Sequence, residues 1–362
     1  MCVLILTWCS TSPITHPTTL STNSGSIPSE IVTPNTPIQW SWSQPDSWSV
    51  IPDYLDITID WSGLQFDRIL DQNSSYTRYQ ISYLSNGLRI SWIMNIPVWD
   101  GPYPLIILNH GYIDPAIYTI GRGLRREQDY LARNGYAVLH TDYRNHGWSD
   151  TDPNWSDYEY MRSKYYGIDA LNAIQAVRQA ILDTNPIVNK IDANRVWMLW
   201  HSMWGGVTMY GLVARPDMVD AAVLYAPVHS DEYNNFQRWM NNRITPAQRQ
   251  TLSGTLWWLT SDSFAPISPQ TYFDRIDDPV QIYFGTSDDS CPIQRWRDIR
   301  DALVVADKSV TLIEYPWEEH EFWPQWWSFM KWVVEFFDQE VAPTASISYH
   351  SSLSSVGETI RS

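Results

Sequence analysis

Short, unbroken runs of apolar residues alternate with segments of helical periodicity through the middle of the chain. The apolar runs are Leu105–Leu108, Ala137–Leu139, Val196–Leu199, Ala221–Tyr225, Val280–Phe284 and Val310–Ile313. Strands that are apolar at every position are typical of a parallel sheet buried on both faces. Helical patterns occur at Ile168–Ile181, Met203–Ala214 and Pro324–Glu340. This alternation predicts a mostly parallel, doubly wound α/β sheet.

Two segments depart from this alternation. Near the start, the strand-like runs Arg78–Leu84 and Leu88–Ile96 flank Asn86-Gly87, a dipeptide that favours a tight hairpin turn. We therefore expect an N-terminal antiparallel hairpin. Residues of about 228–275 interrupt the strand–helix order with polar, Trp-rich sequence, which predicts a short cap insertion.

Both ends of the chain have a composition that does not favour a packed core. Residues 10–38 and 341–362 are rich in Ser, Thr or Pro and poor in large apolar residues, which predicts a linker and a disordered tail around a domain at 39–340. Residues 1–9 form a short apolar run that ends at Cys9, similar to a bacterial lipoprotein signal. We expect a lipid anchor at Cys9 and an extracytoplasmic location. Without that processing, a cytoplasmic location is the alternative.

Charge and cysteine content narrow the function classes. The chain has 24 Lys and Arg against 40 Asp and Glu, a net charge of −16. Such a surface repels phosphate backbones, so we expect no nucleic-acid partner. The three cysteines, Cys2, Cys9 and Cys291, are too few and too far apart for a disulfide framework. The oligomeric state cannot be read from these features.

Several segments that follow the predicted strands carry reactive side chains. They are Asn109–Tyr112, Trp200–Gly206, Gly285–Pro292 and Tyr315–Phe322. In an open α/β sheet the carboxyl ends of the strands lie at one edge, where ligands bind. Acyl transfer by serine needs a nucleophile on a sharp turn, a base, an orienting acid and an oxyanion hole. These four segments hold candidates for each role.

The segment Trp200-His201-Ser202-Met203-Trp204-Gly205-Gly206 resembles the nucleophile elbow Gly-His-Ser-Met-Gly-Gly of α/β-hydrolases. The resemblance implies that Ser202 is the nucleophile and that the backbone N–H of Met203 is one oxyanion donor. An ordinary N-cap serine is the alternative interpretation.

The other segments fit the same family. Gly285–Pro292 is similar to the pattern Gly-x-x-Asp-x-x-Val-Pro, which assigns the acid to Asp288, with Asp289 as the alternative. Tyr315–Phe322 is similar to the loop Pro-Gly-x-x-His-x-Phe, which assigns the base to His320. The His-Gly pair before Tyr112 implies that the Tyr112 N–H is the second oxyanion donor. The order Ser, Asp, His is that of α/β-hydrolases.

Residues 78–340 most resemble the catalytic domain of the prolyl oligopeptidase family and related esterases, and Ser268–Ile276 adds to the likeness. The resemblance implies a serine hydrolase without metal or organic cofactor that acts on small molecules or short peptides. The roughly 100 residues before the core are too few for the propeller of those peptidases, so we expect no gating by a propeller. Peptidase, carboxylesterase or thioesterase, and non-catalytic binding protein remain the three interpretations.

Tryptophan stands where these motifs expect glycine. The six positions are Trp8, Trp148, Trp197, Trp200, Trp204 and Trp317. An indole beside the nucleophile should clash, because strand and helix approach closely there. We hypothesise that the gene reads UGA as glycine and is translated here with UGA as tryptophan. Six reversions would raise Gly from 16 to 22 and lower Trp from 21 to 15. UGG codons at 200 and 204 would contradict this hypothesis and favour a genuine pseudoenzyme.

Overall fold

The structure is a computed structural model that describes residues 59–153, 163–202, 205–256 and 259–341. The predicted lipoprotein signal, the linker and nearly all of the C-terminal tail lie outside the described residues. So do Met203 and two of the six tryptophans, Trp8 and Trp204. The expectations placed on these positions therefore remain predictions.

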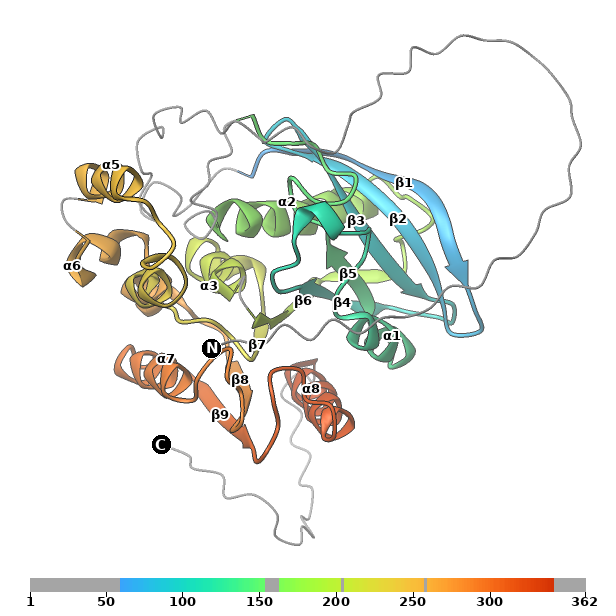
Figure 1. Ribbon diagram of the computed structural model, residues 1–362. Helices are drawn as coiled ribbons and strands as arrows, with labels where there is room; N and C mark the ends of the chain where they lie inside the picture. The colour runs from blue at the N-terminus through green and yellow to red at the C-terminus, as the bar shows by residue number, and fades with distance from the viewer. Residues whose placement is uncertain (1–58, 154–162, 203–204, 257–258, 342–362) are drawn as a thin grey trace, which may run out of the picture. The chain divides into compact units, whose positions relative to one another are not determined.

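Nine strands form one sheet in the order β1-β2-β3-β5-β4-β6-β7-β8-β9 (Figure 1). They are β1 (Trp61–Gln72), β2 (Tyr76–Ser85), β3 (Leu88–Pro97), β4 (Tyr103–Asn109), β5 (Ala137–Thr141), β6 (Ile191–His201), β7 (Ala221–Tyr225), β8 (Val280–Gly285) and β9 (Val310–Tyr315). The first three strands pair antiparallel with their neighbours, and β4 to β9 pair parallel. The prediction of a mostly parallel sheet with an antiparallel N-terminal part is confirmed.

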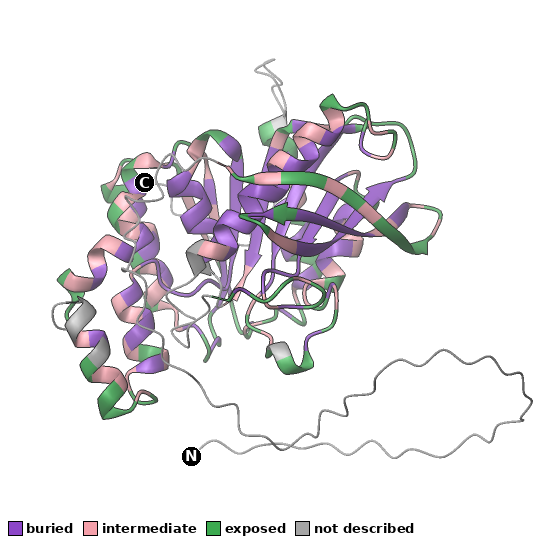
Figure 2. Cartoon of the chain, turned by 90° about the horizontal axis from the view of Figure 1, so that it is seen from above, coloured by how far each residue is buried: buried purple, intermediate pink, exposed green. Residues whose placement is uncertain are grey.

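The predicted hairpin is formed by β2 and β3. Its turn residues Asn86 and Gly87 both have left-handed φ values, 52° and 77°, as a two-residue hairpin turn of this kind requires. The edge strand β1 was not predicted. Most of its residues are exposed, whereas β4, β5 and β7 are buried at every position (Figure 2). Most of the apolar runs therefore mark the interior of the sheet, whereas Val310–Ile313 lies in β9, a half-buried strand at its other edge.

Helices cover both faces of the sheet. The helices that pack on it are α1 (Arg125–Arg133), α2 (Ser163–Leu182), α3 (Gly205–Ala214), α7 (Gln294–Val305) and α8 (Trp326–Val341). Helices α1 and α8 lie on one face, and α2 and α3 lie on the other (Figure 1). Trp197 of β6 stacks on Phe337 of α8 with ring centroids 5.2 Å apart. No helix among the described residues is long and apolar enough to cross a membrane.

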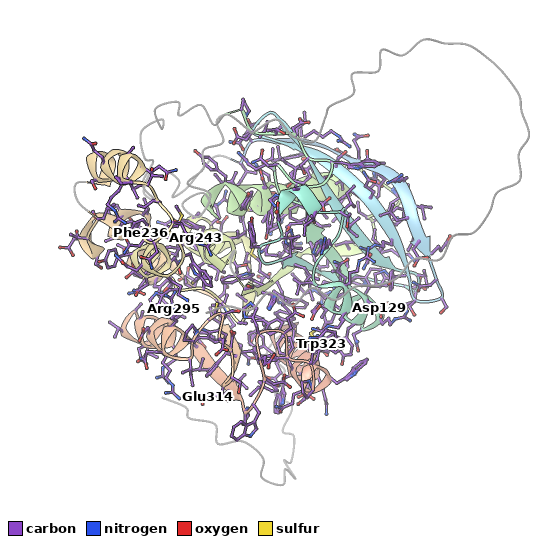
Figure 3. All side chains as sticks on the ribbon, viewed as in Figure 1. Asp129, Phe236, Arg243, Arg295, Glu314 and Trp323 are labelled. Carbon is purple, nitrogen blue, oxygen red and sulfur yellow. The ribbon has the colours of Figure 1, made fainter. Side chains whose placement is uncertain are left out.

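Short helices fill the predicted cap region between β7 and β8. They are α4 (Glu232–Asn235), η6 (Phe236–Met240), α5 (Pro246–Leu256), α6 (Ser261–Phe264), η7 (Ala265–Ile267) and η8 (Pro269–Arg275). Phe236, Met240, Leu252, Phe264 and Ile267 form a small apolar core of their own. Phe236 and Arg243 mark this region in Figure 3. It meets the sheet domain at the loop after β8, where the Arg238 guanidinium donates to the Asp289 carbonyl oxygen at 2.9 Å.

A buried carboxyl group in this region makes stability depend on pH. Glu232 is 4% exposed and accepts one hydrogen bond, from the Asn235 amide at 3.3 Å. Burial raises the pKa of Glu232 to about 8. An unfolded Glu has a pKa of about 4.3, so between these values the unfolded chain loses a proton that the folded chain keeps. The Glu232 carboxyl therefore lowers the stability of the folded chain progressively as pH rises through this window.

Glu232→Gln should remove this penalty. We expect the difference in unfolding free energy between the variant and the parent to grow by a few kcal/mol from about pH 5 to pH 8, and then to level off. Urea unfolding at a series of pH values measures it. Glu335→Gln, on the outer side of α8, is the control and should run parallel to the parent. A difference for Glu232→Gln that does not change with pH would contradict this prediction.

Candidate active site

Ser202 follows directly on the last residue of β6. Its φ is 70°, in the left-handed region that non-glycine residues rarely adopt. Its carbonyl oxygen accepts from the Val228 N–H at 3.3 Å, which ties the turn to the segment after β7. A serine strained on a sharp turn between a strand and a helix is the backbone geometry of a nucleophile elbow.

Three side chains from distant parts of the sequence form one hydrogen-bonded chain. The Ser202 hydroxyl lies 2.6 Å from His320 Nε2, and His320 Nδ1 lies 2.8 Å from the nearer carboxylate oxygen of Asp288. The structure thus brings together the three residues that the motifs single out. His320 is in the loop between β9 and α8, and Asp288 is in the loop after β8. All three therefore lie at the carboxyl ends of parallel strands.

The backbone around Asp288 orients its carboxylate. Oδ1 accepts the N–H groups of Ser290 and Cys291, each at 2.8 Å, and Oδ2 faces His320. Asp288 is 6% exposed, and the side chain of Asp289 is exposed. Because Asp288 is the one whose carboxylate faces the imidazole, the geometry favours it over Asp289 as the partner of His320.

The loop that carries Asp288 (the acid loop, 286–293) and the loop that carries His320 (the histidine loop, 316–325) are joined by a backbone hydrogen bond. The Ser287 N–H donates to the Glu318 carbonyl oxygen at 2.9 Å. A Cβ on Gly285 would lie 2.1 Å from that same carbonyl oxygen, so only glycine allows the two loops to approach this closely. The buried Glu318 side chain accepts from the Gln325 N–H and so links the histidine loop to the start of α8. Gly285 is the first residue of the acid motif, but the motif gave no reason for it, and no motif singled out Glu318.

A second close approach lies at the end of β4. A Cβ on Gly111 would lie 2.7 Å from Ser202 Cβ and 3.2 Å from its hydroxyl oxygen. The buried His110 donates from Nδ1 to the Gly111 carbonyl oxygen at 2.6 Å. Burial lowers the pKa of His110 to about 3, so the ring is neutral. In a trans peptide the N–H of Tyr112 points opposite to that carbonyl. The role of the Tyr112 N–H as an oxyanion donor remains a prediction.

The four described tryptophans at glycine positions differ in their surroundings. Trp197 and Trp200 are buried in the core, and their indole N–H groups have no partner among the described residues. The clash expected at Trp200 remains a prediction, and the structure shows a different cost, a buried indole donor without a partner among the described residues. Trp148 is 49% exposed under the Arg68 guanidinium. Trp317 is 85% exposed.

Trp317 is the one of these four with a left-handed backbone, at φ 67°. It follows Pro316 in a four-residue turn from Tyr315 to Glu318. The Glu318 N–H closes this turn by donating to the Tyr315 carbonyl oxygen at 3.3 Å. Pro followed by a residue with positive φ is the pattern of a type II turn, in which the second position favours glycine. The backbone at 317 is thus suited to glycine, as the motif predicts.

Trp317→Gly should stabilise the protein. A left-handed L-residue costs about 1 to 2 kcal/mol, and the extra flexibility of glycine in the unfolded chain offsets part of that gain, so we expect a net increase of about 0.5 to 1 kcal/mol. Denaturant unfolding measures it. Trp332→Gly makes the same chemical change on an exposed position of α8 and should destabilise by about 1 kcal/mol. Equal losses in both variants would contradict the prediction.

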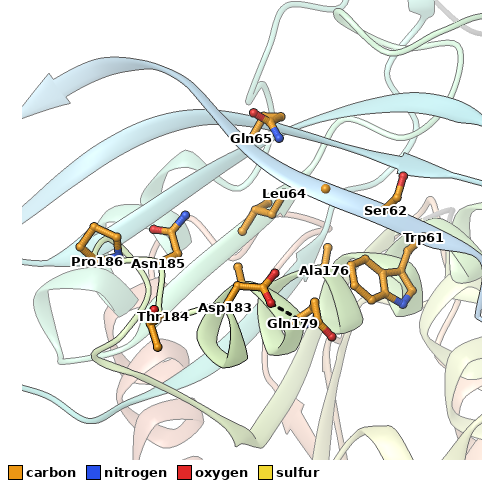
Figure 4. Close-up of a pocket in the computed structure, with 12 residues that line it drawn as sticks. Trp61, Ser62, Leu64, Gln65, Ala176, Gln179, Asp183, Thr184, Asn185 and Pro186 are labelled. Atoms are coloured by element: carbon orange, nitrogen blue, oxygen red, sulfur yellow. Dashed lines mark hydrogen bonds between the residues drawn. The ribbon is translucent and has the colours of Figure 1, made fainter.

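A hollow of about 520 Å³ lies away from these side chains, between β1 and the end of α2 (Figure 4). Its lining includes Leu64, Gln65, Asp183 and Gln179, and the Gln179 amide donates to Asp183 at 2.7 Å. None of the residues that line it belongs to the chain of Ser202, His320 and Asp288. It is therefore separate from the candidate active site.

The family model described as "Alpha/beta hydrolase family" matches residues 106–349. The chain belongs to this family. It is 27% identical over 267 residues to a protein of Bacillus subtilis (strain 168) named "Uncharacterized peptidase YuxL". The alignment covers 70% of this chain and 37% of that protein. The chain thus spans little more than a third of the length of this relative.

Solved structures share the fold at low sequence identity. The acylaminoacyl peptidase of Pyrococcus horikoshii is 16% identical with a TM-score of 0.56, over 76% of this chain and 43% of the peptidase. Acetyl xylan esterase 1 of Thermoanaerobacterium sp. JW/SL YS485 is 18% identical with a TM-score of 0.57, over 85% of this chain and 100% of the esterase. These likenesses confirm the predicted α/β-hydrolase fold.

Proposed function

We propose that this protein is a serine hydrolase that cleaves peptide or ester bonds through an acyl-enzyme, with Ser202, His320 and Asp288 as its catalytic triad. The observation that carries the proposal is the unbroken hydrogen-bond chain among these three side chains, at 2.6 and 2.8 Å. Membership of the α/β-hydrolase family supports it. The curated relative named as a peptidase supports a hydrolytic activity of this kind.

The geometry suits a two-step reaction. His320 Nε2 takes the proton of the Ser202 hydroxyl as its oxygen attacks the substrate carbonyl carbon. Asp288 accepts from His320 Nδ1 and stabilises the imidazolium that forms. The N–H groups of Tyr112 and Met203 would hold the developing oxyanion. His320 then protonates the leaving amine or alcohol, and water releases the acyl group by the same steps.

A carboxylesterase or thioesterase is the second candidate function. The observation that favours it is the likeness to acetyl xylan esterase 1, which shares the fold over 85% of this chain with a TM-score of 0.57. Ester and peptide hydrolysis use the same triad chemistry, so the candidate site supports both. The bond that is cleaved depends on the substrate-binding surface.

Parallel assays decide between the two. The purified protein is given a series of p-nitrophenyl acyl esters and a series of N-acylated aminoacyl p-nitroanilides, which differ in the scissile bond. We expect a kcat/KM above background on at least one series, and loss of that activity in Ser202→Ala. Turnover of esters alone would assign an esterase, and turnover of both a peptidase. No turnover by a folded protein would contradict the proposal and favour a binding protein.

A further inference from the structure

His201 lies beside the candidate nucleophile and the candidate base, yet the proposed reaction gives it no role. It is the last residue of β6, directly before Ser202. Its ring packs against the ring of Tyr225 on β7, with centroids 4.4 Å apart. The ring of His320 lies 4.7 Å away on the histidine loop. His201 therefore links the end of β6, which leads to the nucleophile, to the neighbouring strand β7 and to the base.

The ring also forms a defined hydrogen bond. His201 Nε2 lies 3.0 Å from the backbone carbonyl oxygen of His320. A carbonyl oxygen only accepts, so Nε2 carries the proton and donates it. Desolvation by the surrounding protein lowers the pKa of His201 to about 3, and the nearby His320 acts in the same direction. The ring is thus neutral, with its tautomer set by this bond.

The His201 bond holds the main chain of His320, the residue of the histidine loop that is the proposed base. The loop is joined to the acid loop through the Ser287 N–H and the Glu318 carbonyl oxygen. The His201 bond joins it to the nucleophile strand, and it does so at the main chain of His320 itself. The position of that main chain sets whether Nε2 of His320 reaches the Ser202 hydroxyl at 2.6 Å.

We propose that His201 is a positioning residue, which holds the main chain of His320 so that its imidazole stays aligned on Ser202. The proposal rests on the proposed serine-hydrolase function. A displacement of about 1 Å in such an arrangement reduces the reaction rate by about 100-fold. Loss of this one bond should therefore lower kcat and leave KM nearly unchanged, because His201 acts on the base and does not bind substrate.

His201→Phe and His201→Gln separate the hydrogen bond from the packing of the ring. Phe keeps an aromatic ring against Tyr225 but has no N–H, whereas the Gln side-chain amide can place an N–H near the position of Nε2. The measurements are kcat and KM on the ester or anilide that the parent turns over, the rate of inactivation by a fluorophosphonate, and thermal unfolding. The control is Tyr225→Phe, which removes only a hydroxyl that has no partner among the described residues.

We expect His201→Phe to lower kcat and the inactivation rate by about 10- to 100-fold with KM within about 2-fold. His201→Gln should recover most of the loss, and Tyr225→Phe should match the parent. In proton NMR spectra, the far-downfield resonance of the His320 Nδ1 proton bound to Asp288 should broaden in the Phe variant and remain in the Gln variant.

Two outcomes would overturn the proposal while the parent reacts with the fluorophosphonate. One is a His201→Phe variant as reactive as the parent. The other is a His201→Gln variant that folds but is at least about 10-fold slower than the parent, which decides the question even if the Phe variant fails to fold. A folded parent that does not react would instead contradict the proposed function itself.

Discussion

Asp288→Asn should lower kcat by about 10⁴-fold while the protein stays folded, since the equivalent loss of the orienting carboxylate has an effect of this size in serine proteases. The backbone N–H groups of Ser290 and Cys291 require an acceptor at the Oδ1 position. An Asn side chain therefore presents its amide group to His320 Nδ1. That nitrogen must then accept, which leaves the proton on Nε2, where it blocks removal of the Ser202 proton. Steady-state kinetics on the best substrate measure the effect.

Asp289→Asn is the matched control, one residue further along the same loop. Its side chain is exposed and does not face His320, so we expect a kcat within about 2-fold of the parent, as for surface substitutions away from a site. The reverse result, with Asp289→Asn inactive and Asp288→Asn active, would assign the acid to Asp289 and contradict the geometry described above.

Gly111→Ala should lower the rate by about 100-fold or more through displacement of the nucleophile. The added methyl group would lie 2.7 Å from Ser202 Cβ and 3.1 Å from the His201 carbonyl oxygen. Neither neighbour can move freely, because His201 is the last residue of β6 and Ser202 lies on the strained turn directly after it. The turn or the Gly111–Tyr112 peptide must shift, and with it the proposed oxyanion donor. The rate of fluorophosphonate inactivation measures this directly.

Gly211→Ala serves as its control. Gly211 lies in α3, and a Cβ there would meet its nearest neighbours at 3.6 to 3.9 Å, which is ordinary contact. Alanine also favours the helix by about 1 kcal/mol over glycine. We expect unchanged kinetics and equal or higher stability. A Gly111→Ala variant that behaves like this control would show that the close approach to Ser202 does not matter for reaction.

The sequence predicts strands β4 to β9 well, and the exposed strand β1 and the helix α1 poorly. Strands β4, β5 and β7 are buried at every position, so they appear as unbroken apolar runs. Strand β1 is an exposed edge with no fully buried position, and helix α1 reads Arg-Arg-Glu-Gln-Asp-Tyr-Leu-Ala-Arg. Strand β1 lacks a run of buried apolar residues, and α1 is a nine-residue helix with few apolar residues, so neither is identified from one sequence. Tertiary contacts, not local pattern, hold these elements in place.

The residues of the candidate site also fall into those that the sequence identifies and those that only the structure identifies. Ser202, Asp288 and His320 each follow a predicted strand, so local motifs identify them. The contributions of His201, Gly285 and Glu318 arise from approach between segments far apart in the sequence, such as the Ser287–Glu318 backbone bond. A single sequence shows which residues are present, but it does not show the distances between segments that are far apart in the chain. Structure is therefore needed to find the contacts that align the three side chains.

The central claim is that Ser202 is an activated nucleophile, and covalent labelling tests it most directly. The chain as written and a version with Trp148→Gly, Trp197→Gly, Trp200→Gly, Trp204→Gly and Trp317→Gly are treated with a fluorophosphonate, and the adduct is mapped by mass spectrometry. We predict one adduct, on Ser202, that is absent from Ser202→Ala. Labelling of the glycine version alone would also support glycine at these positions. If both chains fold and neither is labelled, the protein is a binding protein on a hydrolase scaffold and the claim is wrong.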